Sequence, residues 1–237
     1  MINLDEVKHN IHKKFEELKF QEDKHEYEAQ NKKLKSVSYF IKDYTEEFNP
    51  INAALGVAKK TGKTVAQVLQ EWENIKNESC ELGTKTHLFG EHFVLTGENN
   101  PSNGYEEAIV KFWTDLPEHL VPVTLELKMY CIKMGIAGTA DIILYNKQTN
   151  KFIIADYKTN KDLFKNFKGK RLKAPFNNLL DSPFDKYNIQ LSMYQILFEL
   201  TGYEVENRFI IWLKPDAEYE IYYTQDLRKE INNLYNF

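Results

Sequence analysis

Two aspartates and one lysine lie at positions that a β-hairpin would bring onto one face. Two apolar runs flank the polar segment 146–150, whose composition is typical of a tight turn between antiparallel strands. A turn centred between positions 148 and 149 places Asp141 directly opposite Asp156. Because side chains alternate along a strand, Lys158 then lies on the same face as Asp156. The sequence therefore predicts that two carboxylates and one ammonium group converge.

These three groups have the types needed for metal-assisted hydrolysis. Opposed residues on antiparallel strands have Cβ atoms only about 5 Å apart, so two ionised aspartates there repel each other unless a positive charge lies between them. A divalent cation meets that need, and carboxylate oxygens favour Mg2+ or Mn2+. A lysine beside a metal-bound water can orient it, help to deprotonate it, or stabilise charge on a phosphate. An ordinary cross-strand salt bridge is the competing interpretation.

Four short segments resemble, in order, motifs of the RecB-type nucleases in the PD-(D/E)XK superfamily. Residues 138–141 (GTAD), 156–159 (DYKT) and 190–194 (QLSMY) resemble the G-x-x-D, D-x-K-T and Q-x-x-x-Y motifs. Residues 83–87 (GTKTH) resemble the G-x-x-x-H element that precedes the sheet in these nucleases. The similarity covers about residues 80–200 and is strongest to the compact exonucleases of phages and of mitochondrial genome maintenance.

The resemblance implies a role for each motif residue. One or two Mg2+ or Mn2+ ions would be bound by His87, Asp141, Asp156 and the backbone carbonyl of Tyr157. Lys158 would be the catalytic lysine, and Gln190 and Tyr194 would hold the site together or touch the scissile strand. The implied fold is α/β or α+β, with a restriction-endonuclease-like αβββαβ core, a mixed sheet and an added N-terminal helical layer.

The implied reaction is hydrolysis of phosphodiester bonds, in which a metal-bound water attacks phosphorus in line. An exonuclease that acts in DNA repair, recombination or replication fits the resemblance best. Its partner would be DNA with a free end or a single-stranded portion, and recombination or replication proteins are further candidates. Endonuclease action is one alternative. A catalytically silent, DNA-binding subunit is another, although the intact Asp141, Asp156 and Lys158 argue against it.

A cationic segment directly follows the predicted catalytic strand. Residues 158–173 include seven basic residues and one acid, Asp162. A flexible segment of this kind can neutralise phosphates that flank the scissile one, while Phe164 and Phe167 could stack on unpaired bases. A lysine-rich loop that is merely solvated is the competing interpretation. The candidate DNA-binding residues are Lys161, Lys165, Lys168, Lys170, Arg171 and Lys173.

Composition is that of an ordinary globular chain, and we expect one domain over 1–237, mostly helical over 1–120 and with the nuclease core over 121–237. The net charge of −4 taken alone disfavours a nucleic-acid partner. The charge is unevenly distributed, however, and the basic segment 158–173 could still bind one. The two cysteines exclude the related nucleases that hold an iron–sulfur cluster on four cysteines. No apolar run reaches 18 residues and the first residues are polar, so we expect a cytoplasmic protein without a membrane partner.

The remaining pattern predicts the elements that position these residues. Glu126 lies in an alternating run at 123–129 that indicates a strand, and it is either a further acidic member of the site or an exposed strand glutamate. Gly83, inside a predicted helix, indicates close approach to another backbone. Helices are expected at 3–19, 36–48, 64–75, 79–95, 105–115 and 182–201, a hairpin at 25–35, and strands at 205–213 and 218–223.

Overall fold

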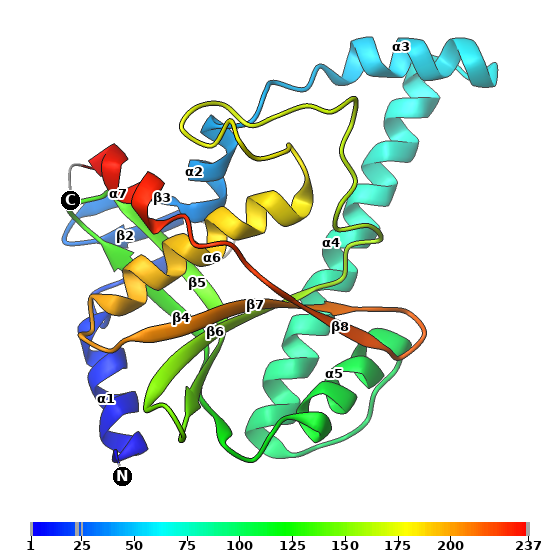
Figure 1. The fold of residues 1–237 in the computed structure, drawn as a ribbon. Helices are drawn as coiled ribbons and strands as arrows, with labels where there is room; N and C mark the ends of the chain where they lie inside the picture. Colours follow the sequence, from blue (N-terminus) through cyan, green and yellow to red (C-terminus); the bar gives the residue numbers. More distant parts are fainter. Residues whose placement is uncertain (1, 22–23, 25, 236–237) are drawn as a thin grey trace.

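A mixed, eight-stranded β-sheet organises the chain in the computed structural model, which describes residues 2–21, 24 and 26–235 (Figure 1). Its strands are β1 (Lys19–Gln21), β2 (Glu26–Ala29), β3 (Lys32–Ser36), β4 (Leu120–Cys131), β5 (Ile136–Asn146), β6 (Lys151–Lys158), β7 (Val205–Leu213) and β8 (Tyr219–Tyr223). The pairs β3–β5 and β6–β7 are parallel and the others antiparallel. The expected α/β class with a mixed sheet is confirmed.

Strand β5 has a gap in its pairing along one edge. Strand β4 pairs along one side of β5 from Ile136 to Asn146. The other side is shared, because β3 pairs only at Ile136 and Ala137 and β6 pairs only from Ile142 onward. Residues 138–141 therefore have no strand partner on that edge within the described chain. This opening coincides with the GTAD segment.

The hairpin between β5 and β6 has the predicted register. Tyr145 pairs with Phe152, and the ladder continues to the pair Ile142 and Ala155. Asp141 and Asp156 occupy the next facing positions, where β6 leaves β5 and continues beside β7 alone as far as Lys158. The separation of the two strands at this point leaves room for side chains from a third element.

Helices cover both faces of the sheet (Figure 1). They are α1 (Leu4–Lys14), α2 (Val37–Asp43), α3 (Pro50–Thr61), α4 (Val65–Thr96), α5 (Gly104–Asp115), α6 (Pro183–Glu199) and α7 (Arg228–Tyr235). One buried layer joins α1, α2, α6 and α7 to the sheet, and a second joins α4 and α5 to its opposite face. Thr64 caps α4 and Ser182 caps α6, at the positions where the sequence predicts helices to begin.

Three predicted helix boundaries are wrong. The helices expected at 64–75 and 79–95 are one 32-residue helix, α4, since the residues between them include neither proline nor glycine. The helix expected to reach residue 48 ends at Asp43, and Asn49 instead caps α3, with Pro50 at its first position. Helix α1 ends at Lys14, before strand β1.

Helix α4 is the longest element, and its first half projects from the body together with α3 (Figure 1). Of α3 and that half of α4, only Ala54 and Val68 are buried. The second half of α4 crosses the sheet at the opening in β5. Within the described ranges, no helix combines the length and apolarity needed to cross a bilayer.

Candidate metal centre

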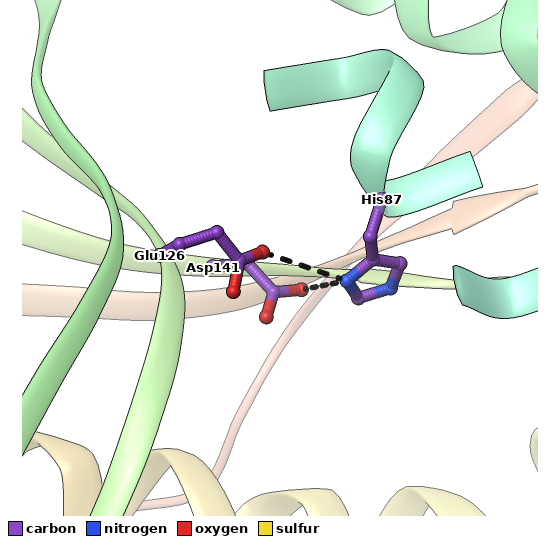
Figure 2. A group of neighbouring side chains, drawn as sticks. All are labelled: His87, Glu126 and Asp141. Atoms are coloured by element: carbon purple, nitrogen blue, oxygen red, sulfur yellow. Dashed lines mark ion pairs between the residues drawn. The ribbon is translucent and has the colours of Figure 1, made fainter. Parts of the chain in front are cut away.

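Three side chains from three elements converge at the opening in β5. His87 comes from α4, Glu126 from β4 and Asp141 from β5, and their ligand atoms all lie within 4.8 Å of one another (Figure 2). The His87 Nδ1 atom lies 3.3 Å from Asp141 Oδ2 and 3.9 Å from Glu126 Oε1. Glu126 and Asp141 carry the negative charge and His87 adds a nitrogen donor, so the group has the composition of a metal site.

The position of His87 depends on close packing between α4 and β6. A Cβ atom on Gly90 would lie 2.9 Å from the Tyr157 ring, so only glycine allows this contact. Tyr157 also accepts a hydrogen bond from Trp113 Nε1 at 2.5 Å, which fixes its ring from the other side. His87 precedes Gly90 by about one helical turn and is thereby held over the sheet. The close approach expected at Gly83 is therefore found at Gly90, because a Cβ on Gly83 would meet only Thr159 Oγ1, at 3.8 Å.

The two ring nitrogens of His87 have different partners. Nε2 lies 3.1 Å from the Tyr157 carbonyl oxygen, the group expected from the resemblance to be a metal ligand. Because this oxygen can only accept, Nε2 carries an N–H that donates to it; Nδ1 then donates to Asp141 when the ring is protonated, or offers its lone pair to a metal ion when the ring is neutral. Burial lowers the pKa of His87, but Asp141 and Glu126 raise it more, to about 9. In the absence of a cation, the imidazolium is the group that offsets these carboxylates.

Glu126 was left outside the predicted core set, and the structure places it inside the cluster. Its backbone has φ of +48°, a left-handed conformation that is rare for a strand residue and indicates local strain. The turn at Ile132 and Gly135 sets Cys131 opposite Ile136. Five residues further along each strand, Glu126 faces Asp141 in the same register. That count from the turn is the sequence signal that would have identified it.

The segments resembling G-x-x-D and Q-x-x-x-Y contact each other directly. Gln190 Nε2 donates to Tyr194 Oη at 2.9 Å, one turn apart on α6. A Cβ on Gly138 would lie 2.7 Å from the Tyr194 ring, so the glycine lets α6 pack tightly on β5. Asp141 follows three residues later and accepts a hydrogen bond from Tyr157 N at 3.0 Å. Gln190 and Tyr194 thus position the strand that carries Asp141, and both also line a cleft that His87 and Glu126 border.

Asp156 and Lys158 form a buried ion pair beside the cluster. Asp156 is 1% exposed, and neither of its oxygens accepts a hydrogen bond of good geometry from the described residues. Lys158 is its ion-pair partner. Burial and the nearby Asp141 raise the pKa of Asp156 to about 6. Burial lowers the pKa of Lys158, but Asp156 and Asp141 raise it well above its usual value, so the ammonium is charged at neutral pH.

Tyr187 and Asn160 fix the position of Lys158, and neither was predicted as a site residue. The Lys158 ammonium lies 4.8 Å from the centre of the Tyr187 ring. Tyr187 Oη donates to Asn160 Oδ1 at 2.7 Å, and the Asn160 carbonyl accepts from Trp212 Nε1 at 2.7 Å. These contacts join α6, β7 and the end of β6 behind the lysine. A cation–π contact of this kind depends on the fold and leaves no motif in the sequence.

The donor set fits a hard divalent ion. His87, Glu126 and Asp141 offer one imidazole nitrogen and two carboxylate oxygens, ligands that suit Mn2+ well and Mg2+ through the oxygens. Asp156 was expected to be a fourth ligand, but it lies outside this group and faces Lys158. With His87 neutral, the three carboxylates exceed the single lysine in charge, so the site has a net negative charge that a cation would balance.

The cationic segment packs against the body. Leu163, Leu172 and Phe176 are buried, and Arg171 pairs with Leu180 in an isolated β-bridge. Three of the candidate DNA-binding residues have partners within the chain. Lys170 pairs with Glu46, Arg171 donates to the carbonyls of Asn177 and Asn178, and Lys173 contacts the end of α2 through backbone and side chain.

The other three candidate DNA-binding lysines are available to a ligand. Lys161, Lys165 and Lys168 are exposed and have no partner among the residues that the structure describes. Of the interleaved aromatic residues, Phe164 packs against Phe184 and Tyr222, whereas Phe167 is 68% exposed. The predicted set of six thus divides into three paired and three unpaired basic residues.

Comparison with known proteins adds no family to this description. No family model matches the chain, and no curated protein matches it either. Functional conclusions therefore depend on the geometry of the chain's own residues and on the resemblance of the four short motifs.

Proposed function

We propose that this chain is a divalent-metal-dependent nuclease that hydrolyses phosphodiester bonds in DNA, most simply as an exonuclease. The observation that carries the proposal is the convergence of His87, Glu126 and Asp141 beside the buried pair of Asp156 and Lys158. The order α5-β4-β5-β6-α6-β7 agrees with the αβββαβ core of restriction-endonuclease-like enzymes and supports the same proposal. The ordered motifs supply the substrate class, because the nucleases that carry them act on DNA.

The proposed roles of the residues follow from their contacts. His87 Nδ1, Glu126 and Asp141 would hold Mg2+ or Mn2+, which when bound supplies Lewis-acid activation of water and neutralises phosphate charge. Lys158 is a permanently charged donor at neutral pH, so it would stabilise negative charge on the phosphate rather than accept a proton. Asp156 holds the ammonium in place. Tyr157 orients His87 through its carbonyl.

A cleavage assay with two DNA forms tests this proposal. End-labelled linear DNA and covalently closed circular DNA are incubated with the protein in Mg2+, in Mn2+ and in chelator. We expect metal-dependent release of short products from linear DNA and little loss of the circle. Cleavage of the circle would replace exonuclease by endonuclease action. Full activity in chelator, or no cleavage of any DNA with either metal, would contradict the proposal.

A further inference from the structure

The metal centre lies at one end of a cleft of about 680 Å3. The three elements that carry the candidate ligands also line the cleft with further residues. Helix α4 has Leu88 and Glu91 beside His87, β4 has Lys128 two residues from Glu126, and β5 has Thr139 two residues from Asp141. Lys128 and Thr139 also pair directly across the strands.

The far end of this cleft is aromatic and cationic. Phe20 of β1 and Tyr27 of β2 have ring centroids 4.5 Å apart, and Tyr27 Oη shares a hydrogen bond with Thr139 at 3.0 Å. The Lys128 ammonium lies 5.9 Å from the centre of the Phe20 ring. On the α4 side, Leu88 is a large apolar side chain that is 59% exposed. An aromatic ring, an exposed apolar side chain and a cation thus line the same cleft as the candidate metal centre.

We propose that this part of the cleft binds the nucleotide next to the scissile phosphate, with its base between Phe20 and Leu88 and its further phosphate on Lys128. The inference rests on the proposed function, because it takes the scissile phosphate to lie at the metal centre. Two residues along a strand span about 7 Å, so Lys128 follows Glu126 at a spacing suited to the next phosphate of a nucleic-acid strand.

The chemistry of the cleft selects an unpaired nucleotide. A base inside a duplex is stacked on both faces, and it must leave the stack before it can lie against a protein ring. Stacking on an aromatic side chain accepts any base, since every base has a π-face. The substrate class that follows is a single-stranded or frayed end, with little sequence preference at this position.

A double-mutant cycle between protein and DNA tests the contact. Single-stranded oligonucleotides with one abasic position, moved along the strand, are titrated by fluorescence anisotropy with Ca2+ in place of the catalytic metal. In the wild type, we expect one position to weaken binding by about 5- to 100-fold. In Phe20→Leu, which keeps an apolar side chain in β1, the same position should cost several-fold less, because the stacking partner is already gone.

Control variants separate this effect from altered folding or general weakening. Tyr223→Leu changes an aromatic residue that is 63% exposed on β8, away from the cleft, and should leave the abasic profile unchanged. Lys128→Gln should lower the slope of log K against log salt by about 0.7, whereas Lys8→Gln on α1 should not. Thermal unfolding of each variant confirms that it is folded.

The outcomes distinguish the inference from the proposed function. An abasic profile that is identical in wild type and Phe20→Leu, in a protein that cleaves DNA with metal, would overturn the nucleotide site alone. A profile that changes equally in Tyr223→Leu would overturn it as well. Absence of both DNA binding and metal-dependent cleavage would overturn the proposed function and this inference together.

Discussion

Two clusters of charged side chains contact helix α6, and they differ in how completely their charges are paired. At the C-terminal end, Arg228 donates to Glu199 at 2.8 Å and to Asp226 at 2.8 Å. Gln195 bridges Glu199 and the Val205 carbonyl, and Arg208 contacts Gln195. Two arginines face two carboxylates there, and among the described side-chain atoms of this cluster only Arg208 Nε is buried without a hydrogen-bond partner.

The candidate metal centre, toward the other end of α6, has the opposite character. Asp141, Asp156 and Glu126 face one lysine and one titratable histidine, and buried Asp156, although paired in charge with Lys158, accepts no hydrogen bond of good geometry from the residues that the structure describes. The pKa directions differ accordingly. Hydrogen bonds from Arg228 lower the pKa of Asp226, whereas burial raises that of Asp156. Paired charges indicate a scaffold, and carboxylates in excess around a cleft indicate a site that an external cation completes.

The largest expected effect is a loss of DNA cleavage when the buried ion pair of Asp156 and Lys158 is changed. Asp156→Asn or Lys158→Ala should reduce cleavage by about 100- to 10,000-fold, because each removes a group that orients or stabilises charge at the phosphate. The metal-free fold of Asp156→Asn should survive, since this change relieves carboxylate repulsion. Single-turnover cleavage and thermal unfolding measure the two effects. Retained cleavage in folded Lys158→Ala would contradict the role of this lysine.

Metal affinity should depend on the histidine of the cluster and not on a histidine elsewhere on the same helix. His87→Ala should weaken Mn2+ binding by at least about 10-fold in titration calorimetry, because it removes the nitrogen donor. His92→Ala is the matched control, since His92 also lies on α4 but pairs with the exposed Glu98. Glu126→Gln should resemble His87→Ala. Unchanged Mn2+ affinity and stoichiometry in both cluster variants would show that the ion binds elsewhere.

The same distinction between paired and unpaired charges applies to the cationic segment. Replacing Lys161, Lys165 and Lys168 by Gln should flatten the slope of log K against log salt for single-stranded DNA by about 2 if all three contact phosphates. Replacing Lys170, Arg171 and Lys173 should change the slope less, because these side chains are held within the chain. Equal slopes in the two triple variants would show that intrachain pairing does not determine where DNA binds.

Local sequence patterns were sufficient to predict the register of one hairpin, but not the contacts between elements that are distant in the sequence. The alternation and turn at 146–150 were sufficient for the β5–β6 register, since a strand has a period of two and the turn fixes the offset. To place Glu126 beside Asp141, the register between β4 and β5 would also have to be known. The left-handed backbone conformation of Glu126 could not be predicted from local patterns. Tyr187 and Gly90 act through contacts between distant elements, which short motifs do not encode.

The length of α4 was underestimated for a related reason. The sequence predicts two helices, at 64–75 and 79–95, because the apolar pattern fades between them. The residues in between are exposed, where the helix projects from the body. Exposed residues give no periodicity, yet nothing in residues 76–79 ends a helix. The division of the cationic segment into paired and unpaired residues could not be predicted either, since it depends on Glu46 and on the backbone carbonyls of Asn177 and Asn178, which lie outside the segment.

The smallest expected effect concerns the pH dependence of stability, and it should have opposite signs in the two clusters. Asp226 has a lowered pKa in the folded state, so it stabilises the fold above its unfolded pKa and this contribution is lost as pH falls through the folded value. Asp156 has a raised pKa of about 6, so the folded, metal-free protein binds a proton before the unfolded chain does. Its ionisation therefore destabilises the fold, and stability recovers as pH falls through 6 toward the unfolded pKa of about 4.

Urea unfolding of metal-free protein at several pH values, in chelator, reports these signs as differences from matched variants. Relative to Asp156→Asn, the wild type should be less stable at pH 7 and should approach the variant as pH falls from about 6 to about 4. Relative to Asp226→Asn, it should be more stable at pH 7, by about 1 kcal/mol for a partly exposed pair, and should lose that advantage only in more acidic solution. Parallel curves for the two variants would mean that Asp156 is as well paired as Asp226, and the contrast between site and scaffold would fail.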